Sequence, residues 1–249
     1  MKPISKVQLI ITVLVIAGII ALFANRKIAA PVPTDNTPSA IVEWPSVETD
    51  KKTISEENQY YAINASYPVT KDDRITAHLK AFVEDQIAQF KEDTAWVMDE
   101  SIDSSASGVL SLEVDYREQR STHADNYIFQ ITSYTGGAHG LQATRTFAFD
   151  KIGKSIVLTD LFTNGEAGIK TVATFVQTEL TKKKISDADW IKDGAGATAD
   201  NYQNFVIEDT GVTFIFDPYQ VAAYAAGTQN ILVPVSVFKS IANPEVFGK

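Results

Sequence analysis

Between residues 59 and 150 the chain alternates hydrophobic and polar positions in short runs, which is typical of strands with one buried face. The runs are residues 59–68, 108–120, 126–135 and 144–150, followed by a short apolar stretch at 155–158. Because short polar or glycine-containing segments separate the later runs, they predict an antiparallel meander. Residues 201–209, 211–227 and 229–238 contain further strand patterns, the first two forming a hairpin across Asp209–Gly211.

Two longer stretches repeat apolar residues at steps of three and four, which predicts amphipathic helices. The first stripe is Ile75, Leu79, Phe82, Val83, Ile87 and Phe90, with Thr70 as its expected N-cap. The second stripe is Ile169, Val172, Phe175, Val176 and Leu180, and a short terminal helix is expected at 236–241. Because the helices do not alternate one for one with the strands, we expect an α+β fold with largely antiparallel sheets and two long amphipathic helices.

The amino-terminal segment contains a long apolar run without charge, Leu9–Ala24, with two basic residues on either side. A helix of about 18 residues spans a hydrocarbon core of about 30 Å. Residues 1–27 are therefore predicted to be a short cytoplasmic tail and one transmembrane helix. A cleaved signal peptide is the alternative, although neither candidate cleavage site has small residues at both preferred positions.

Four prolines and many polar residues follow the apolar run, and they predict a proline-rich tether at residues 28–54. Two domains are expected beyond it, at 55–150 and 151–249. Because the tail before the anchor is short and the remaining body is large, we expect a single-pass membrane protein with the body outside the cytoplasm.

The charge of the chain restricts its partners. The formal net charge is −9, and the part after Lys27 carries 18 basic residues against 31 acidic ones, a net charge of −13. Such a body would be repelled by nucleic acids and anionic lipid headgroups, whereas it would attract a basic protein. The chain has no cysteine, which excludes disulfides, thiol catalysis and zinc–thiolate sites.

One distinctive segment is "SYTGGAHG", which is followed by an alternating strand, "LTDLF" and an amphipathic helix. Another is "FIFDPYQVAAYAAG", followed by "ILVPVS". Together these segments resemble the paired domains of unknown function called DUF4163 and DUF3298. The resemblance implies a DUF4163-like domain at 55–150 and a DUF3298-like domain at 151–249.

The resemblance also implies a place outside the cytoplasm. In that family the pair occurs in a membrane-anchored anti-sigma factor that senses lysozyme, and beside a catalytic domain in a peptidoglycan deacetylase. This sequence departs from both, since only about six residues precede its anchor and no separate metal-binding domain with paired histidines is evident. The resemblance therefore favours an extracytoplasmic module and transfers neither activity.

The glycine-rich segment is the first candidate ligand-binding site. Gly136, Gly137 and Gly140 can adopt positive φ angles, so two strands can reverse there and leave His139 on an exposed tip. Bare backbone N–H groups and the imidazole would then contact a ligand. The alternative is a turn whose glycines serve geometry alone. The histidines at 78 and 123 lack ligand spacing to His139, so no metal is expected.

A second candidate lies in "FDPYQVAAYAAG", which offers Asp217, Tyr219 and Tyr224. Tyrosine faces can stack on sugar rings, and Asp217 is suited to an Asx turn with the following backbone. The alternative is that both tyrosines pack a crossover between strands. Trp96 and Trp190 are expected to fill the edges of the core.

These features favour a membrane-anchored extracytoplasmic module that binds or senses a ligand. The ligand would be a cell-wall glycan such as peptidoglycan, or a cationic protein such as lysozyme. The alternative is an enzyme that modifies envelope polysaccharide, or its accessory domain. No catalytic residue, metal or cofactor is assigned, because no acid–base, nucleophile or metal constellation is evident.

Overall fold

The computed structural model describes residues 50–98, 109–137 and 139–248. The predicted anchor at 1–27 and the predicted tether up to residue 49 lie outside these ranges. None of the helices within the described ranges is long and apolar enough to cross a membrane. All of the described residues belong to one structural unit.

The mixed α+β fold is confirmed, and most strand pairs are antiparallel. The strands are β1 (Asp50–Glu57), β2 (Tyr61–Val69), β3 (Leu110–Arg120), β4 (Asp125–Tyr134), β5 (Leu141–Phe149), β6 (Ser155–Ile156), β7 (Phe205–Ile207), β8 (Gly211–Phe216) and β9 (Gln229–Pro234). The α-helices are α2 (Asp73–Asp93), α3 (Gly165–Lys183), α4 (Ala188–Gly194), α5 (Val235–Phe238) and α6 (Pro244–Phe247).

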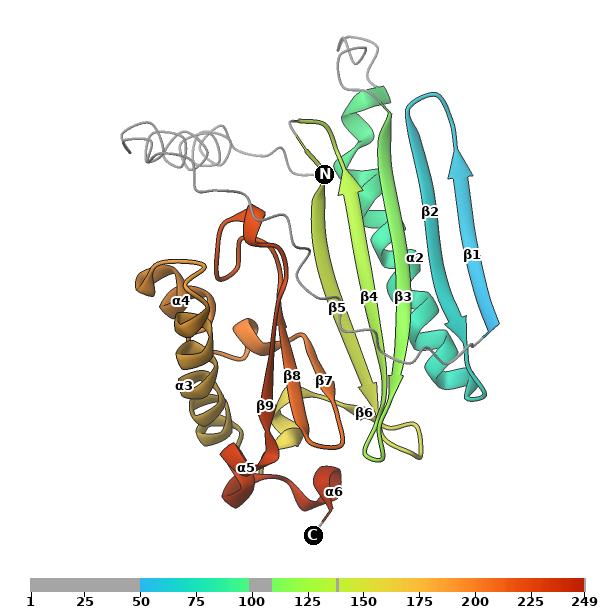
Figure 1. The fold of residues 1–249 in the computed structure, drawn as a ribbon. Coiled ribbons are helices and arrows are strands. Elements are labelled where there is room, and N and C mark those ends of the chain that lie inside the picture. Colours follow the sequence, from blue (N-terminus) through green and yellow to red (C-terminus); the bar gives the residue numbers. More distant parts are fainter. Residues whose placement is uncertain (1–49, 99–108, 138, 249) are drawn as a thin grey trace, which may run out of the picture. The chain divides into compact units, whose positions relative to one another are not determined.

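The strands form two sheets (Figure 1). Strands β1 to β6 make a six-stranded sheet in sequence order, and β7 to β9 make a three-stranded sheet. The pair β2–β3 is parallel. This follows from the connection between them, since α2 carries the chain back to the starting end of β2 before β3 begins.

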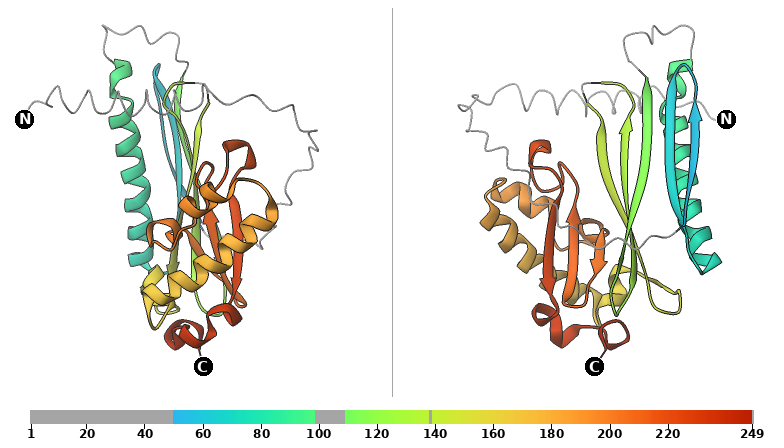
Figure 2. Two further views of the ribbon diagram at one scale, coloured as in Figure 1. Left: turned by 90° about the vertical axis from the view of Figure 1, so that its left-hand side faces the viewer. Right: turned by 45° about the vertical axis from the view of Figure 1, so that its right-hand side comes forward.

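Helix α2 covers one face of the six-stranded sheet (Figures 1 and 2). The predicted stripe is confirmed, because five of its six residues are buried on α2: Ile75, Leu79, Val83, Ile87 and Phe90. The predicted N-cap at Thr70 is wrong. Asp72 is the N-cap and accepts a hydrogen bond from the Arg74 N–H at 2.8 Å, while the Thr70 hydroxyl donates to the Asp72 carbonyl at 2.8 Å.

Strand β1 is not foreseen in the sequence, and it begins inside the predicted tether. Its residues from Asp50 to Glu57 all pair with β2. Six of its eight side chains are exposed because β1 lies at the edge of the sheet, where only one neighbouring strand is present. An edge strand of this kind needs no continuous apolar face, so the alternation that predicts a strand is weak.

The three-stranded sheet lies beside β5, with α3 on its far side (Figure 1). The predicted hairpin across Asp209–Gly211 is confirmed as β7–β8, and α3 buries most of the second predicted stripe. Side chains of the larger sheet hold β7 in place. The Asn126 amide exchanges hydrogen bonds with both the N–H and the carbonyl of Ile207, and the Thr146 hydroxyl accepts from the Phe205 N–H at 2.8 Å.

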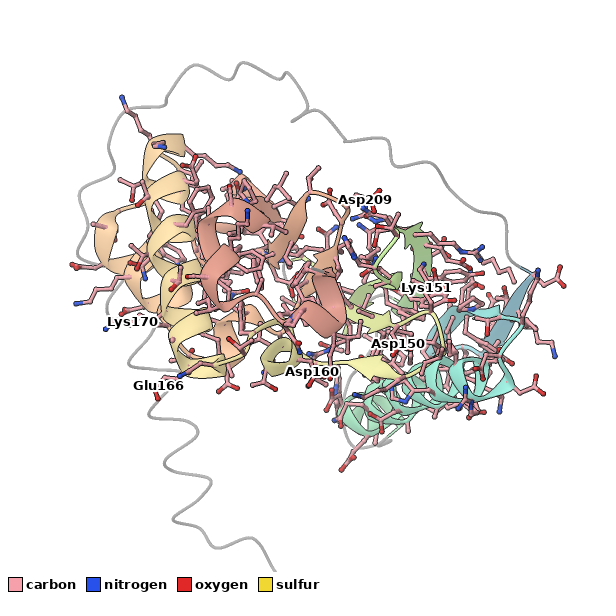
Figure 3. All side chains as sticks on the ribbon, turned by 90° about the horizontal axis from the view of Figure 1, so that it is seen from below. Asp150, Lys151, Asp160, Glu166, Lys170 and Asp209 are labelled. Carbon is pink, nitrogen blue, oxygen red and sulfur yellow. The ribbon has the colours of Figure 1, made fainter. Side chains whose placement is uncertain are left out.

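A further link joins the β3–β4 turn to the β7–β8 turn. Figure 3 shows this end of the unit, with Asp209 and Lys151 labelled. The Asp209 carboxylate accepts hydrogen bonds from the N–H and the hydroxyl of Thr122, at 2.7 and 2.8 Å. These bonds, with the nearby positive charge of Lys151, hold the pKa of Asp209 below its ordinary value. The two halves of the chain are therefore fastened through several independent polar contacts.

Candidate functional site

The glycine-rich segment reverses the chain between β4 and β5, as predicted. Gly136 and Gly137 have φ angles of +96° and +118°, which suit glycine. The expected positive φ at Gly140 is not observed. Glycine is favoured there for another reason, because an added Cβ would lie 3.1 Å from the Ser133 carbonyl oxygen. The loop is thus a tight turn, and it leaves open space beside Gly137, where no atom lies within 4 Å of an added Cβ.

His139 leaves this turn and stacks on Tyr224 from the other half of the chain. The ring centroids are 4.7 Å apart and the planes differ by 28°. The His139 Nδ1 lies 2.8 Å from the Gly140 carbonyl oxygen, so Nδ1 donates and Nε2 is the acceptor in the neutral ring. The Tyr224 hydroxyl donates to the same carbonyl at 3.4 Å. The two predicted segments therefore meet at one place.

Tyr219 extends the pair into a row of three rings. Its centroid lies 5.4 Å from that of Tyr224, and its side chain is 49% exposed. Both tyrosines pack against each other in the crossover between β8 and β9, as the alternative predicts, but Tyr219 keeps an exposed ring and Tyr224 is half-buried. We call the row of His139, Tyr224 and Tyr219 the aromatic surface.

The backbone of Tyr219 is held in an unfavourable conformation. Its φ angle is +72°, in the left-handed region that costs a residue other than glycine roughly 1–2 kcal/mol. The Trp190 indole N–H donates to the Tyr219 carbonyl at 3.0 Å, which fixes this conformation. Strained residues persist where the surroundings hold them, and they gather at functional sites. An exposed ring at such a position contributes little to the core, so core packing alone does not account for the strain.

Two tryptophans contact the residues of the site. The sequence pattern gives no sign that either of them lies near it. Trp190 was expected at a core edge and instead anchors Tyr219. Trp96 was also expected at a core edge, and it does pack partly buried against the core of the larger sheet. Its ring would lie 3.5 Å from a Cβ added to Gly136, so it also supports the underside of the turn.

Asp217 positions the second segment rather than facing outward. The predicted Asx turn is wrong, because its carboxylate accepts a hydrogen bond from the Thr144 N–H of β5 at 3.0 Å. The backbone carbonyl of Asp217 accepts from the Gln220 N–H instead, at 3.0 Å. The other carboxylate oxygen, Oδ1, is buried and has no hydrogen-bond partner among the described residues. Burial accordingly raises the pKa of Asp217 above its ordinary 3.8.

This raised pKa predicts how stability changes with pH. A carboxyl whose folded pKa exceeds its unfolded value favours the folded state below the unfolded pKa, and that contribution is lost as pH rises through the folded pKa. Asp217→Asn does not ionise, so wild type should lose stability relative to this variant as pH rises from about 4 to 7. Denaturant unfolding of both proteins at each pH measures the difference. A difference that is constant with pH would contradict the prediction.

The three histidines lie in separate surroundings. His78 packs edge-on against Phe147 at 5.2 Å, and His123 lies 5.7 Å from Phe247, whereas His139 stacks on Tyr224. In the described part of the chain, no group of three or more His, Asp or Glu side chains is arranged to hold a metal ion.

Both halves of the chain match known families. Residues 159–236 match the family model described as "Protein of unknown function (DUF3298)". The predicted resemblance to DUF3298 is confirmed. Residues 54–142 match the model described as "Deacetylase PdaC", so the DUF4163 assignment of this half is not supported. The aromatic surface is shared between the two matches, since His139 lies in the PdaC match and both tyrosines lie in the DUF3298 region.

Among curated proteins, the chain is similar to the peptidoglycan-N-acetylmuramic acid deacetylase PdaC of Bacillus subtilis. The two are 28% identical over 257 residues, which covers 100% of this chain and 52% of that protein. The immunogenic protein MPT64 of Mycobacterium tuberculosis is 29% identical over 115 residues, covering 46% of this chain and 50% of that protein. The chain thus spans about half the length of these relatives.

Two solved structures share the fold. A DUF3298 family member from Bacteroides fragilis aligns with a TM-score of 0.57 at 20% identity, covering 80% of this chain and 96% of that one. A DUF3298 family protein from Pseudomonas aeruginosa aligns with a TM-score of 0.54 at 15% identity, covering 81% and 98%. The fold that this chain shares with these two structures therefore extends beyond residues 159–236.

Proposed function

We propose that this protein is an extracytoplasmic module, tethered to the membrane by residues 1–27, that binds cell-wall glycan on its aromatic surface. The similarity to a peptidoglycan deacetylase supports a ligand in the cell wall. The apolar run before residue 27 supports the membrane tether. We infer a binding or accessory role from the exposed aromatic rings of this surface.

The observation that carries the proposal is the exposed ring of Tyr219 at a strained backbone position beside two further stacked rings. Aromatic faces are rigid and amphipathic, so a sugar can stack on the ring while its hydroxyls remain hydrated. Three neighbouring rings offer contacts to more than one sugar of a chain. The bare backbone of Gly137 lies in the turn that carries His139 and allows close approach.

Tyr219→Gly tests this proposal without endangering the fold. Glycine adopts positive φ without the steric cost that Tyr219 bears, so stability should stay equal or rise by up to about 1 kcal/mol. Binding of the full-length chain to purified peptidoglycan should weaken by about tenfold, because a ring face is lost from the binding surface. Co-sedimentation measures binding, and thermal unfolding measures stability.

Ile152→Ala is the matched control, since Ile152 is 79% exposed in the β5–β6 turn, at the end of the sheet away from the glycine turn. It should leave binding unchanged. Unaltered binding of the Tyr219→Gly protein would reject the aromatic surface as the glycan site.

Two alternatives make different predictions. The net charge of −13 beyond Lys27 favours a cationic protein ligand, which requires salt-sensitive binding of lysozyme that persists without glycan. An envelope polysaccharide-modifying enzyme requires release of products from purified cell walls that His139→Ala abolishes. Either result would replace the glycan-binding proposal.

A further inference from the structure

The face of the six-stranded sheet opposite α2 offers a second surface. The three-stranded sheet contacts this face at β4 and β5, through the Asn126 and Thr146 side chains. Strands β1, β2 and β3 lie farther from it (Figures 1 and 2). Their side chains on this face are largely polar, in contrast to the apolar face under α2. A soluble sheet needs such a polar face, but it does not need a hollow there.

The strand register aligns five polar residues in one line across this face, one from each of five neighbouring strands. Each residue is the direct register partner of the next, and all five side chains are exposed. In order from β1 to β5 they are Ser55, Asn64, Glu113, Thr132 and Gln142. Because neighbouring strands lie about 4.8 Å apart, the line extends for roughly 19 Å.

This line lies in a groove. An open hollow of about 530 Å³ is lined by residues of β1 to β4, including Ser55, Asn64 and Glu113. A smaller hollow of about 80 Å³ adjoins it at Thr132, which lines both, and is also lined by Gln142 and by Thr228 of the DUF3298 region. The second hollow also includes Thr144, whose N–H binds Asp217. We call the two hollows together the polar groove, and it leads toward the segment that carries the aromatic surface.

The chemistry of the polar groove suits a ligand with both hydroxyl and ammonium groups. Hydroxyl and carboxamide side chains on its floor can donate and accept hydrogen bonds. Two exposed carboxylates, Glu57 and Glu113, have no ion-pair partner among the described residues. The other acidic groups nearby are already paired, Asp115 with Lys51 at 2.8 Å and Glu56 with Lys91 at 2.6 Å. The groove therefore keeps a local negative charge that a cationic ligand would neutralise.

We propose that the polar groove binds a glycan segment with free amino groups, that is, an amino-sugar polymer from which N-acetyl groups have been removed. The sugar hydroxyls would contact Ser55, Asn64 and Thr132, and the ammonium groups would contact the Glu57 and Glu113 carboxylates. This inference rests on the proposed function, because the same glycan would continue to the aromatic surface. An acetylated glycan offers no positive charge, so the groove would distinguish the two forms.

Isothermal titration of the full-length chain with two soluble probes tests the inference. The probes are the hexamer of glucosamine and the hexamer of N-acetylglucosamine, at a pH where the free amines are protonated. The glucosamine hexamer should bind about tenfold more tightly, and added salt should reduce this preference. Glu113→Gln and Glu57→Gln, which keep the side-chain shape, should each weaken glucosamine binding by about fivefold and leave the acetylated probe unaffected.

Glu166→Gln is the matched control, because Glu166 is an exposed glutamate on α3, away from the six-stranded sheet (Figure 3). Equal binding of the two hexamers, or equal losses in all three glutamine variants, would overturn the inference. Hexalysine that binds as tightly as the glucosamine hexamer would also overturn it, in favour of a cationic peptide. If only this inference fails, Tyr219→Gly still weakens binding to peptidoglycan. If the proposed function fails, Tyr219→Gly leaves peptidoglycan binding unchanged, and this result does not depend on the glutamine variants.

Discussion

Asn126→Ala is expected to lower the free energy of unfolding by about 3–4 kcal/mol. The Asn126 side chain is 1% exposed and connects the two sheets. Its amide group donates to the carbonyls of Gln119 and Ile207 at 2.9 and 3.0 Å, and its carbonyl accepts from the Ile207 N–H at 2.9 Å. Alanine removes all three bonds and leaves buried backbone groups without these partners, each costing about 1–3 kcal/mol when nothing replaces the bond.

Urea denaturation followed by tryptophan fluorescence measures this loss. Asn230→Ala is a suitable control, because Asn230 is an exposed asparagine on β9 and its replacement should change stability by less than about 0.5 kcal/mol. A loss below about 1 kcal/mol for Asn126→Ala would mean that the contact between β4 and β7 does not hold the sheets together.

Gly194→Ala is expected to cost about 2–3 kcal/mol and to weaken glycan binding. Gly194 ends α4, where its carbonyl accepts a hydrogen bond from the Gln220 side chain at 3.0 Å. An added Cβ would lie 1.8 Å from the Gln220 carbonyl oxygen, so the backbone must move apart. Overpacking of this kind costs about 1–3 kcal/mol. Tyr219 precedes Gln220 directly, so the displacement should reach the aromatic surface.

Gly165→Ala on α3 separates crowding from the general effect of replacing a helical glycine. Its added Cβ would lie nearest to Thr159, with the methyl group closest at 3.2 Å, and alanine favours the helix. This variant should therefore unfold within about 0.5 kcal/mol of wild type and bind peptidoglycan normally. Thermal unfolding and co-sedimentation measure both properties. If the Gly194→Ala protein were as stable as wild type and bound peptidoglycan equally well, the prediction would be wrong. The backbone around Tyr219 would then be able to move without loss of stability or binding.

The candidate site was only partly predictable from its residues. Glycines beside His139 predict a turn with an exposed imidazole, and the structure has that turn. Tyr219 and Tyr224 were also consistent with side chains that pack a crossover between strands, because tyrosine occurs both in cores and on surfaces. Exposure of Tyr219 depends on its positive φ, which Trp190 fixes from 29 residues away in the chain. Nothing in the spacing of residues 190 and 219 indicates that bond.

The sequence by itself determined the local elements of this protein. The stripes on α2 and α3, the alternating faces of β3 and β4 and the glycine turn all follow from periodicity, because a side chain's face depends only on its position within its own element. The tertiary structure decided the rest. The edge strand β1, the stacking of His139 on Tyr224, the Asp217–Thr144 bond and the five-strand polar line depend on how distant elements are placed and in which register they pair. That placement results from the packing of the whole core, which no short stretch of sequence contains.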